Sequence, residues 1–122
     1  MSKYIDGYVL PVKKDKLAAY KAMAEKASNV WKKHGALQYF ECVGEDLDSC
    51  KEWGFPFPKL MKLEENEVVI FSFITYGSKN ERDKINKLVM EDPEMKEFCS
   101  SDPDLFDMKK MSMGGFDVLV EK

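Results

Sequence analysis

Arginine and histidine are almost missing from this chain of 122 residues, although lysine is abundant. Arg82 is the only arginine among nineteen basic residues, and the formal net charge is -3. Arginine is the usual bidentate reader of phosphates and base edges, and the lysines here are scattered rather than gathered into one stripe. We therefore expect no nucleic-acid partner, and no lysine-rich face that binds a membrane.

Metal and cofactor signatures are missing as well. His34 is the only histidine, which excludes a metal site built from several histidines of one chain. The nucleotide, hydrolase and thiol-redox motifs GxGxxG, GxxxxGKS/T, GxSxG and CxxC do not occur. The sequence thus predicts neither a metal site nor a resident cofactor.

Cysteines and long apolar runs are few. Cys42, Cys50 and Cys99 are odd in number and widely spaced, which is typical of reduced thiols rather than of a disulfide framework. The N-terminus does not resemble a signal peptide, and no stretch approaches the ~20 apolar residues of a membrane span. We expect a cytoplasmic protein without disulfides.

The apolar residues that are present follow the patterns of four strands and two helices. Leu17, Tyr20, Ala24, Ala27 and Trp31 recur on one helical face, and Ser78 with Glu81 forms a capping box for a second helix that ends at Asp92-Pro93. A loop holding Pro103 precedes the last strand, in which Gly114 and Gly115 indicate a bulge or bend. The predicted strands are 4–12, 36–44, 68–76 and 111–121, and the first helix is 14–34.

The order βαββαβ predicts one α+β domain over residues 1–122 with a ferredoxin-like fold. Right-handed crossovers place the third strand between the first and the second, and the fourth strand beyond the first, in an antiparallel sheet. The two helices then cover one face. Because Val68, Val69, Ile70 and Phe71 put apolar groups on both faces of the third strand, we expect the open face to pack against a second copy in a homodimer.

The segment 45–66 is longer than a hairpin needs and is predicted to be an insertion. It contains WGFPFPK at 53–59. These residues either extend a packing contact or form a lid across a cavity. Trp53 and Phe55, together with Tyr8 of the first strand, are the candidate ligand-binding residues.

Two strand carboxylates are candidate catalytic bases. Asp6 shares its face with Tyr4 and Tyr8, where partial desolvation raises a carboxylate pKa; it serves either as a base or as an acceptor of hydrogen bonds across the sheet. Glu41 is separated from Asp6 by the third strand, so the two do not form an obvious pair; the alternative role is an edge-strand charge.

Two further residues have ordinary structural interpretations beside the catalytic ones. His34 ends a helix, where positive charge suits the helix dipole, and it remains a catalytic candidate. Cys42 is expected to be a small core residue, since no second histidine is available to activate it.

Five segments make the chain similar to the YbaA-like family of bacterial proteins: YIDGYVLPV, KKHGAL, YFECVGED, YGSKNERDKINKLVMEDPEM and GGFDVLVE. The resemblance implies a dimeric α+β barrel, a superfamily that includes cofactor-free oxygenases, haem-handling enzymes and isomerases. WGFPFPK departs from the family pattern. The family-like positions are Asp6, Gly7, Gly35, Glu41, Cys42, Gly44, Asp46, Arg82, Asp83, Pro93, Gly114, Gly115 and Phe116.

Three functions are consistent with these observations. The first is binding of a small apolar or aromatic molecule between sheet and helices. The second is a cofactor-free oxygenase or isomerase that uses Asp6 or Glu41 as its base. The third is a dimer whose apolar faces serve assembly alone.

Overall fold

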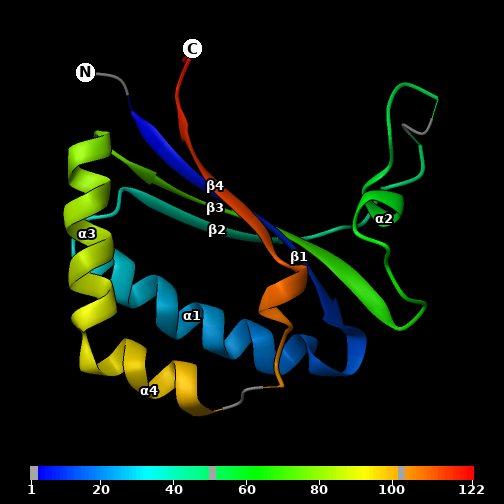
Figure 1. The fold of residues 1–122 in the computed structure, drawn as a ribbon, viewed down its shortest axis with the longest axis horizontal. Helices are drawn as coiled ribbons and strands as arrows, with labels where there is room; N and C mark the ends of the chain where they lie inside the picture. Colours follow the sequence, from blue (N-terminus) through cyan, green and yellow to red (C-terminus); the bar gives the residue numbers. More distant parts are fainter. Residues whose placement is uncertain (1–2, 50–51, 102–103) are drawn as a thin grey trace.

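Four strands form a single antiparallel sheet in the order β2-β3-β1-β4 (Figure 1). The computed structural model describes residues 3–49, 52–101 and 104–122, and of residues 98–101 it describes only the backbone. The strands are β1 (Tyr4–Lys13), β2 (Gln38–Val43), β3 (Glu67–Tyr76) and β4 (Ser112–Asp117). The predicted strand order and the ferredoxin-like α+β architecture are confirmed.

Three helices cover one face of the sheet (Figure 1). They are α1 (Leu17–Lys33), which follows a 3-10 turn at Lys14–Lys16, α3 (Lys79–Glu91) and α4 (Pro93–Ser101). The predicted capping box is present in part: the Ser78 hydroxyl accepts a hydrogen bond from the amide of Glu81 at 3.2 Å. A short helix, α2 (Phe57–Leu60), lies outside this layer, in the segment between β2 and β3.

The core lies between the sheet and these helices. Residues of β1 and β3 alternate toward it, and the buried face of α1 carries Tyr20, Ala24, Ala27 and Val30. Tyr4, Asp6, Tyr8, Leu10 and Val12 share the helix-covered face of β1, because side chains alternate along a strand. The predicted grouping of Asp6 with Tyr4 and Tyr8 is therefore correct.

Helix α4 was not predicted: the sequence indicated two helices, the second of which ends at Asp92-Pro93, and a further helix begins there. Asp92 is the extended C-cap residue that follows α3, and its carboxylate accepts a hydrogen bond from the backbone amide of Glu94 at 2.9 Å. Proline fits the first turn of a helix, because the amide that it lacks has no partner there. The pair thus ends one helix and begins the next; Pro103 lies outside the described residues.

The last strand is shorter and more regular than predicted. It ends at Asp117, so Val118 and Val120 lie beyond it, and Gly114 and Gly115 pair in register with Gly7 and Asp6. No bulge interrupts this pairing. A side chain at position 115 would collide with the Arg82 guanidinium and would lie 2.5 Å from the Tyr4 hydroxyl. The glycine allows Arg82 and Tyr4 to approach the strand closely, and it does not mark a bend.

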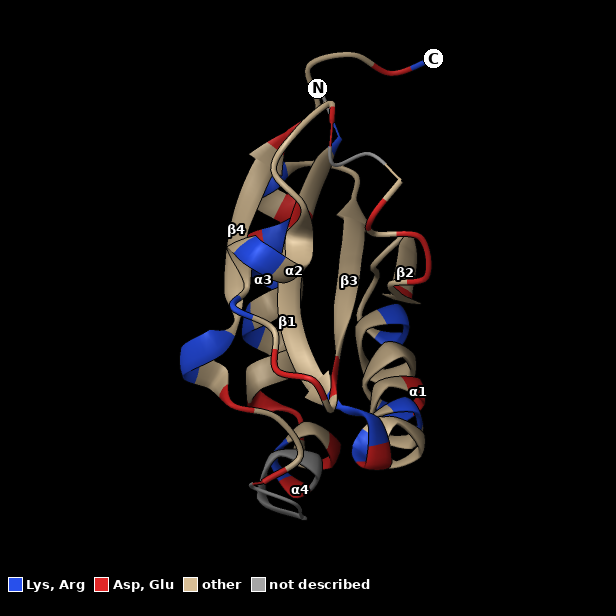
Figure 2. Cartoon of the chain, turned by 90° about the vertical axis from the view of Figure 1, so that its right-hand side faces the viewer, with Lys and Arg blue, Asp and Glu red and all other residues tan. Residues whose placement is uncertain are grey.

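The other face of the sheet is open and largely apolar. Figure 2 shows the strands almost without charge, while lysines and acidic residues lie on helices and loops. Phe73 stacks on Phe40 with ring centroids 4.8 Å apart, and Phe71 lies 5.9 Å from Phe73. We name this surface the open face; its apolar side chains include Ile5, Val9, Phe40, Cys42, Phe71, Phe73 and Phe116, and its polar ones include Gln38, Thr75 and Ser112.

Cys42 is exposed on the open face and is not a core residue of the single chain, which corrects the sequence prediction. The error arose because β2 is an edge strand whose second face has no cover within one chain. The side chain of Cys42 is a free thiol. Cys50 and the side chain of Cys99 lie outside the described residues, so the prediction of three free thiols remains a prediction for them.

Candidate functional site

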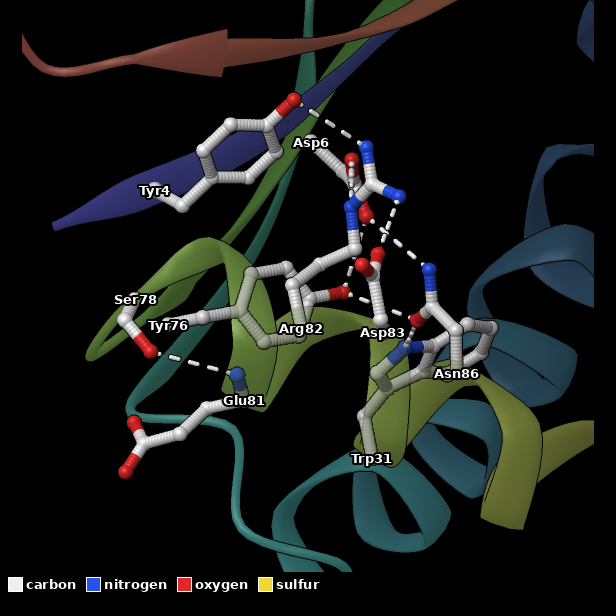
Figure 3. Close-up of polar contacts among 9 residues, drawn as sticks. All are labelled: Tyr4, Asp6, Trp31, Tyr76, Ser78, Glu81, Arg82, Asp83 and Asn86. Carbon is white, nitrogen blue, oxygen red and sulfur yellow. Dashed lines mark hydrogen bonds and ion pairs between the residues drawn. The ribbon is translucent and has the colours of Figure 1, made fainter.

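Asp6 lies at the centre of a polar network beneath the helices (Figure 3). Its Oδ1 is 3.1 Å from Nε of Arg82 on α3, and its Oδ2 accepts hydrogen bonds from the Tyr76 hydroxyl at 3.1 Å and the Asn86 amide at 3.2 Å. The residue is only 4% exposed. A buried carboxylate with a cation and two donors around it is a stable arrangement, and each of these partners leaves less room for a substrate.

The network extends from Asp6 to all the elements around it. Asn86 Oδ1 accepts the indole N–H of Trp31 on α1 at 3.1 Å, and the Tyr76 hydroxyl lies 3.1 Å from the same oxygen. Burial raises the pKa of Tyr76, and the charge of Asp6 adds to this effect. The single hydroxyl proton of Tyr76 therefore stays on the oxygen and is shared between Asp6 and Asn86.

Arg82 completes the network on its exposed side. Its guanidinium carbon lies 4.8 Å from the centroid of the Tyr4 ring, and its Nη2 donates to the Tyr4 hydroxyl at 3.2 Å. Nη1 donates to the exposed carboxylate of Asp83 at 2.9 Å. Since these contacts join β1, β3, α1 and α3, the geometry favours the structural alternative for Asp6, in which it accepts hydrogen bonds across the sheet.

Glu41 has a different setting, and the interpretation as a free edge charge does not fit it. Its Oε1 accepts the hydroxyl of Tyr20 from α1 at 2.8 Å, and its Oε2 accepts the hydroxyl of Tyr39 at 2.7 Å. Ser72 of β3 is a further hydrogen-bond partner. Burial raises the pKa of Glu41, and the three hydroxyl groups oppose that rise only in part.

A pocket of about 560 Å³ lies between α1 and β2, and Glu41 contributes to its lining. We call it the α1–β2 pocket. Its volume is in the range of small-molecule sites, which is roughly 300–1,000 Å³. Most of its wall is apolar or aromatic, with polar groups from Glu41, from the tyrosines that contact it and from exposed residues of α1. The lining residues are Leu17, Ala18, Tyr20, Lys21, Ala24, Glu25, Ser28, Tyr39, Glu41, Cys42, Val43 and Ile70.

The structure separates the sequence-predicted site residues. Asp6 and Glu41 lie on different strands with β3 between them, as predicted, and each has its own partners. Tyr8 packs against both halves of the core, and burial raises its pKa. Trp53 and Phe55 lie on the projecting segment before α2, where they line a separate hollow with Asp46 and Leu47. Trp53 and Phe55 therefore do not meet Glu41, whereas Tyr8 lies in register across Ser72 from Glu41, whose charge adds to the rise in the Tyr8 pKa.

His34 connects two helix ends instead of facing a pocket. It follows the last residue of α1, and its Nε2 lies 2.7 Å from Oδ2 of Asp92 at the end of α3. Lys33 contacts the same oxygen at 2.7 Å, and these two partners hold the pKa of Asp92 well below its usual range. In the part of the chain that the structure describes, no group of three or more His, Cys, Asp or Glu residues could hold a metal ion.

Sequence reasoning missed Tyr20 and Tyr39 as site residues. Both could have been found: Tyr39 is two residues before Glu41 and so shares its strand face, and Tyr20 lies on the buried stripe of the first helix. The distance between α1 and β2 cannot be predicted from the sequence, and the pocket depends on that distance.

The comparisons with known proteins agree with this fold. Residues 3–108 match the family described as "Protein of unknown function (DUF1428)". The protein YbaA of Escherichia coli K12 is 45% identical over 120 residues, which cover 98% of this chain and 99% of YbaA. The chain belongs to this family. The resemblance to YbaA-like proteins is thus confirmed.

Solved structures with low sequence identity are similar to this chain in fold alone. A variant of SnoaB, a cofactor-independent oxygenase from Streptomyces nogalater, has a TM-score of 0.63 at 8% identity, over 99% of this chain and 97% of that one. A putative antibiotic biosynthesis monooxygenase from Nitrosomonas europaea has a TM-score of 0.60 at 12% identity, over 97% and 91%. A dimeric ferredoxin-like protein from an uncultured marine organism has a TM-score of 0.61 at 11% identity, over 100% of both chains.

Of the described residues, no helix is long and apolar enough to cross a membrane.

Glu41 makes the stability of the fold depend on pH, and the sign of this dependence follows from the raised pKa of Glu41. A raised pKa means that the folded state binds the proton more tightly than the unfolded state, so the Glu41 contribution is fully present below the unfolded pKa and is lost as pH rises through the folded pKa. We expect the stability difference between wild type and Glu41→Gln to be larger at pH 4.5 than at pH 7.5. Urea unfolding at both pH values measures it.

The matched control for this experiment is Glu25→Gln, which removes an exposed carboxylate from the same pocket and supplies the baseline. If the difference for Glu41→Gln is instead larger at pH 7.5, the carboxylate is stabilised in its charged form, and the raised pKa is wrong.

Proposed function

We propose that this chain is a cytoplasmic, single-domain homodimer that binds a small, largely apolar or aromatic molecule in the α1–β2 pocket. The observation that carries this proposal is the position of Glu41, a half-buried carboxylate held by two tyrosine hydroxyls in the wall of an otherwise apolar hollow. An apolar hollow with a few convergent polar groups is the usual form of a ligand site.

The chemistry of the pocket narrows the ligand class. Leu17, Val43 and Ile70 provide apolar contacts, and Tyr20 and Tyr39 provide aromatic edges and faces. A ligand with a hydroxyl or N–H group can donate to a free lone pair of Glu41 or accept from a tyrosine that reorients. A neutral aromatic alcohol therefore fits better than an anion, which Glu41 would repel when ionised.

A second candidate function is supported by the raised pKa of Glu41. A carboxylate whose pKa is raised by burial is a better base at neutral pH, and in this pocket it is placed to take a proton from an activated carbon of a bound molecule. Two of the structural neighbours are described as an oxygenase and a putative monooxygenase. This candidate uses the same pocket, so binding is the first property to test.

The assembly part of the proposal rests on the open face. Phe40, Phe71 and Phe116 are exposed there in the single chain, and an aromatic surface of this kind is uncommon on a monomer. Structural neighbours are described as dimeric ferredoxin-like proteins. A symmetric pair that covers the two open faces removes this apolar surface from water.

We expect filling of the pocket to weaken binding of 2-naphthol, a neutral aromatic alcohol used as the probe. Ala18 and Ala19 are neighbouring exposed alanines of α1, and only Ala18 is among the pocket-lining residues. Ala18→Trp should raise the dissociation constant at least about tenfold by occluding the pocket, whereas Ala19→Trp should leave it unchanged. Isothermal titration calorimetry measures both; equal affinity of wild type and Ala18→Trp would contradict the pocket assignment.

A further inference from the structure

The segment between β2 and β3 projects from the body of the protein on the side of the open face. In Figure 1, α1 and α4 lie below the sheet and α3 stands at its left end, whereas residues 52–66 rise above the sheet at the end where β3 begins. Figure 2 shows it in front of the strands, with α2 near β1 and β4. We call residues 52–66 the arm.

The arm carries large apolar side chains that its own chain leaves uncovered. Trp53 is 90% exposed and Phe55 is 71% exposed, and Leu60 of α2 is also exposed. Tryptophan and phenylalanine at such exposure are rare on a monomer surface, and tryptophan is among the residues that contribute most to protein interfaces.

The arm is continuous with the open face. Leu60 and Met61 line one hollow together with Val9 of β1 and Ser112 of β4, which point to the open side of the sheet. Lys62, Glu64, Lys109 and Lys110 also line this hollow, so the surface that joins the strands to the arm is partly apolar and partly charged. A second protein that covers the open face therefore also contacts the arm.

The size of the open face is a second argument. All four strands lie side by side only at the five β3 positions from Phe71 to Thr75, and at ~3.3 Å per residue and ~4.8 Å between strands this region measures on the order of 17 Å by 14 Å. As a flat area this is well below the ~800 Å² of accessible surface that each partner of a stable complex typically buries, although β1 and β3 pair over ten positions and extend the open face beyond it. The sheet alone is a small interface, and the arm supplies adjacent apolar surface.

We infer that the arm is a dimerisation arm, which packs Trp53 and Phe55 against a second copy of this chain. The inference rests on the homodimer of the proposed function and adds the element that completes its interface. In a two-fold dimer each chain contributes the same surface, so two arms flank the pair of sheets. The alternative role as a lid over a cavity of its own chain would require Trp53 to move from this exposed position and become covered.

The test compares two double variants by sedimentation equilibrium. Trp53→Ser with Phe55→Ser removes the apolar arm, and Leu88→Ser with Met90→Ser removes two exposed apolar residues of α3 as the control. The arm variant should raise the dimer dissociation constant at least tenfold, and the control should leave it within twofold. Circular dichroism spectra establish that each variant is folded.

A second measurement uses the unchanged sequence. The chain has two tryptophans, so 5-fluorotryptophan labelling gives one fluorine resonance for Trp31 and one for Trp53. The Trp53 resonance should move, and its solvent isotope shift should shrink, as the protein concentration rises through the dimer transition. A dimer in which neither the arm variant nor the Trp53 resonance responds would overturn the arm inference alone. A chain that stays monomeric at all concentrations would overturn the proposed assembly as well.

Discussion

Replacing Asp6 with asparagine is expected to lower the free energy of unfolding by about 3 kcal/mol. The substitution leaves Arg82 without its buried counter-charge and places an amide group where two donors, from Tyr76 and Asn86, now converge on one oxygen. Removing Asp6 is costly because Arg82 Nε is buried beside it, although the rest of the guanidinium is partly exposed. Urea unfolding at neutral pH measures the loss.

The matched control for Asp6 is Asp83→Asn. Both carboxylates contact Arg82, but the side chain of Asp83 is 52% exposed, so its loss should change stability by less than about 0.5 kcal/mol. If Asp6→Asn instead left stability unchanged or raised it, the network would not hold the fold together. Asp6 would then return as the candidate base, since strained functional groups commonly lower stability.

Replacing Phe71 with aspartate is expected to abolish the dimer while the chain stays folded. Phe71 is 45% exposed on the open face, so a charge there meets water in the monomer. In the dimer, the same change would bury two unpaired carboxylates at several kcal/mol each, which raises the dissociation constant by at least about 1,000-fold. Light scattering should give about twice the 14.1 kDa chain mass for wild type and one chain mass for the variant.

Leu88→Asp is the control for this experiment, because Leu88 is 46% exposed on α3 and lies on the helical side of the molecule. It should remain dimeric. A dimeric Phe71→Asp protein would show that the open face is not the interface. An unfolded one would show that Phe71 belongs to the core, contrary to its position here.

The strand order was predictable because its causes are local and topological. Alternating apolar residues in β1 and β3, the helical stripe of α1 and the capping box before α3 each specify an element, and handedness rules then leave few arrangements. Helix α4 was missed because Pro93 ends one helix and begins another, and sequence alone does not tell these roles apart. Gly115 was misread for a similar reason: close approach of Arg82 and Tyr4 needs a glycine without any bend.

The candidate site was predictable only in part. Glu41 and Asp6 were identified as strand carboxylates, yet their surroundings come from residues far along the chain: Tyr20 for Glu41, and Arg82 and Asn86 for Asp6. Which of two carboxylates lies beside a hollow and which is enclosed depends on how closely the helices pack on the sheet. The distance between helices and sheet is set by the packing of the whole core, so no single segment of the sequence predicts it.

The most direct test of the central claim, binding of a small apolar or aromatic molecule in the α1–β2 pocket, is an amide chemical-shift titration of isotope-labelled protein with 2-naphthol. We predict saturable shift changes that concentrate on residues 17–28 of α1 and 39–43 of β2, the segments that line the pocket. Saturable changes confined to the open face, or no saturable change, would contradict it.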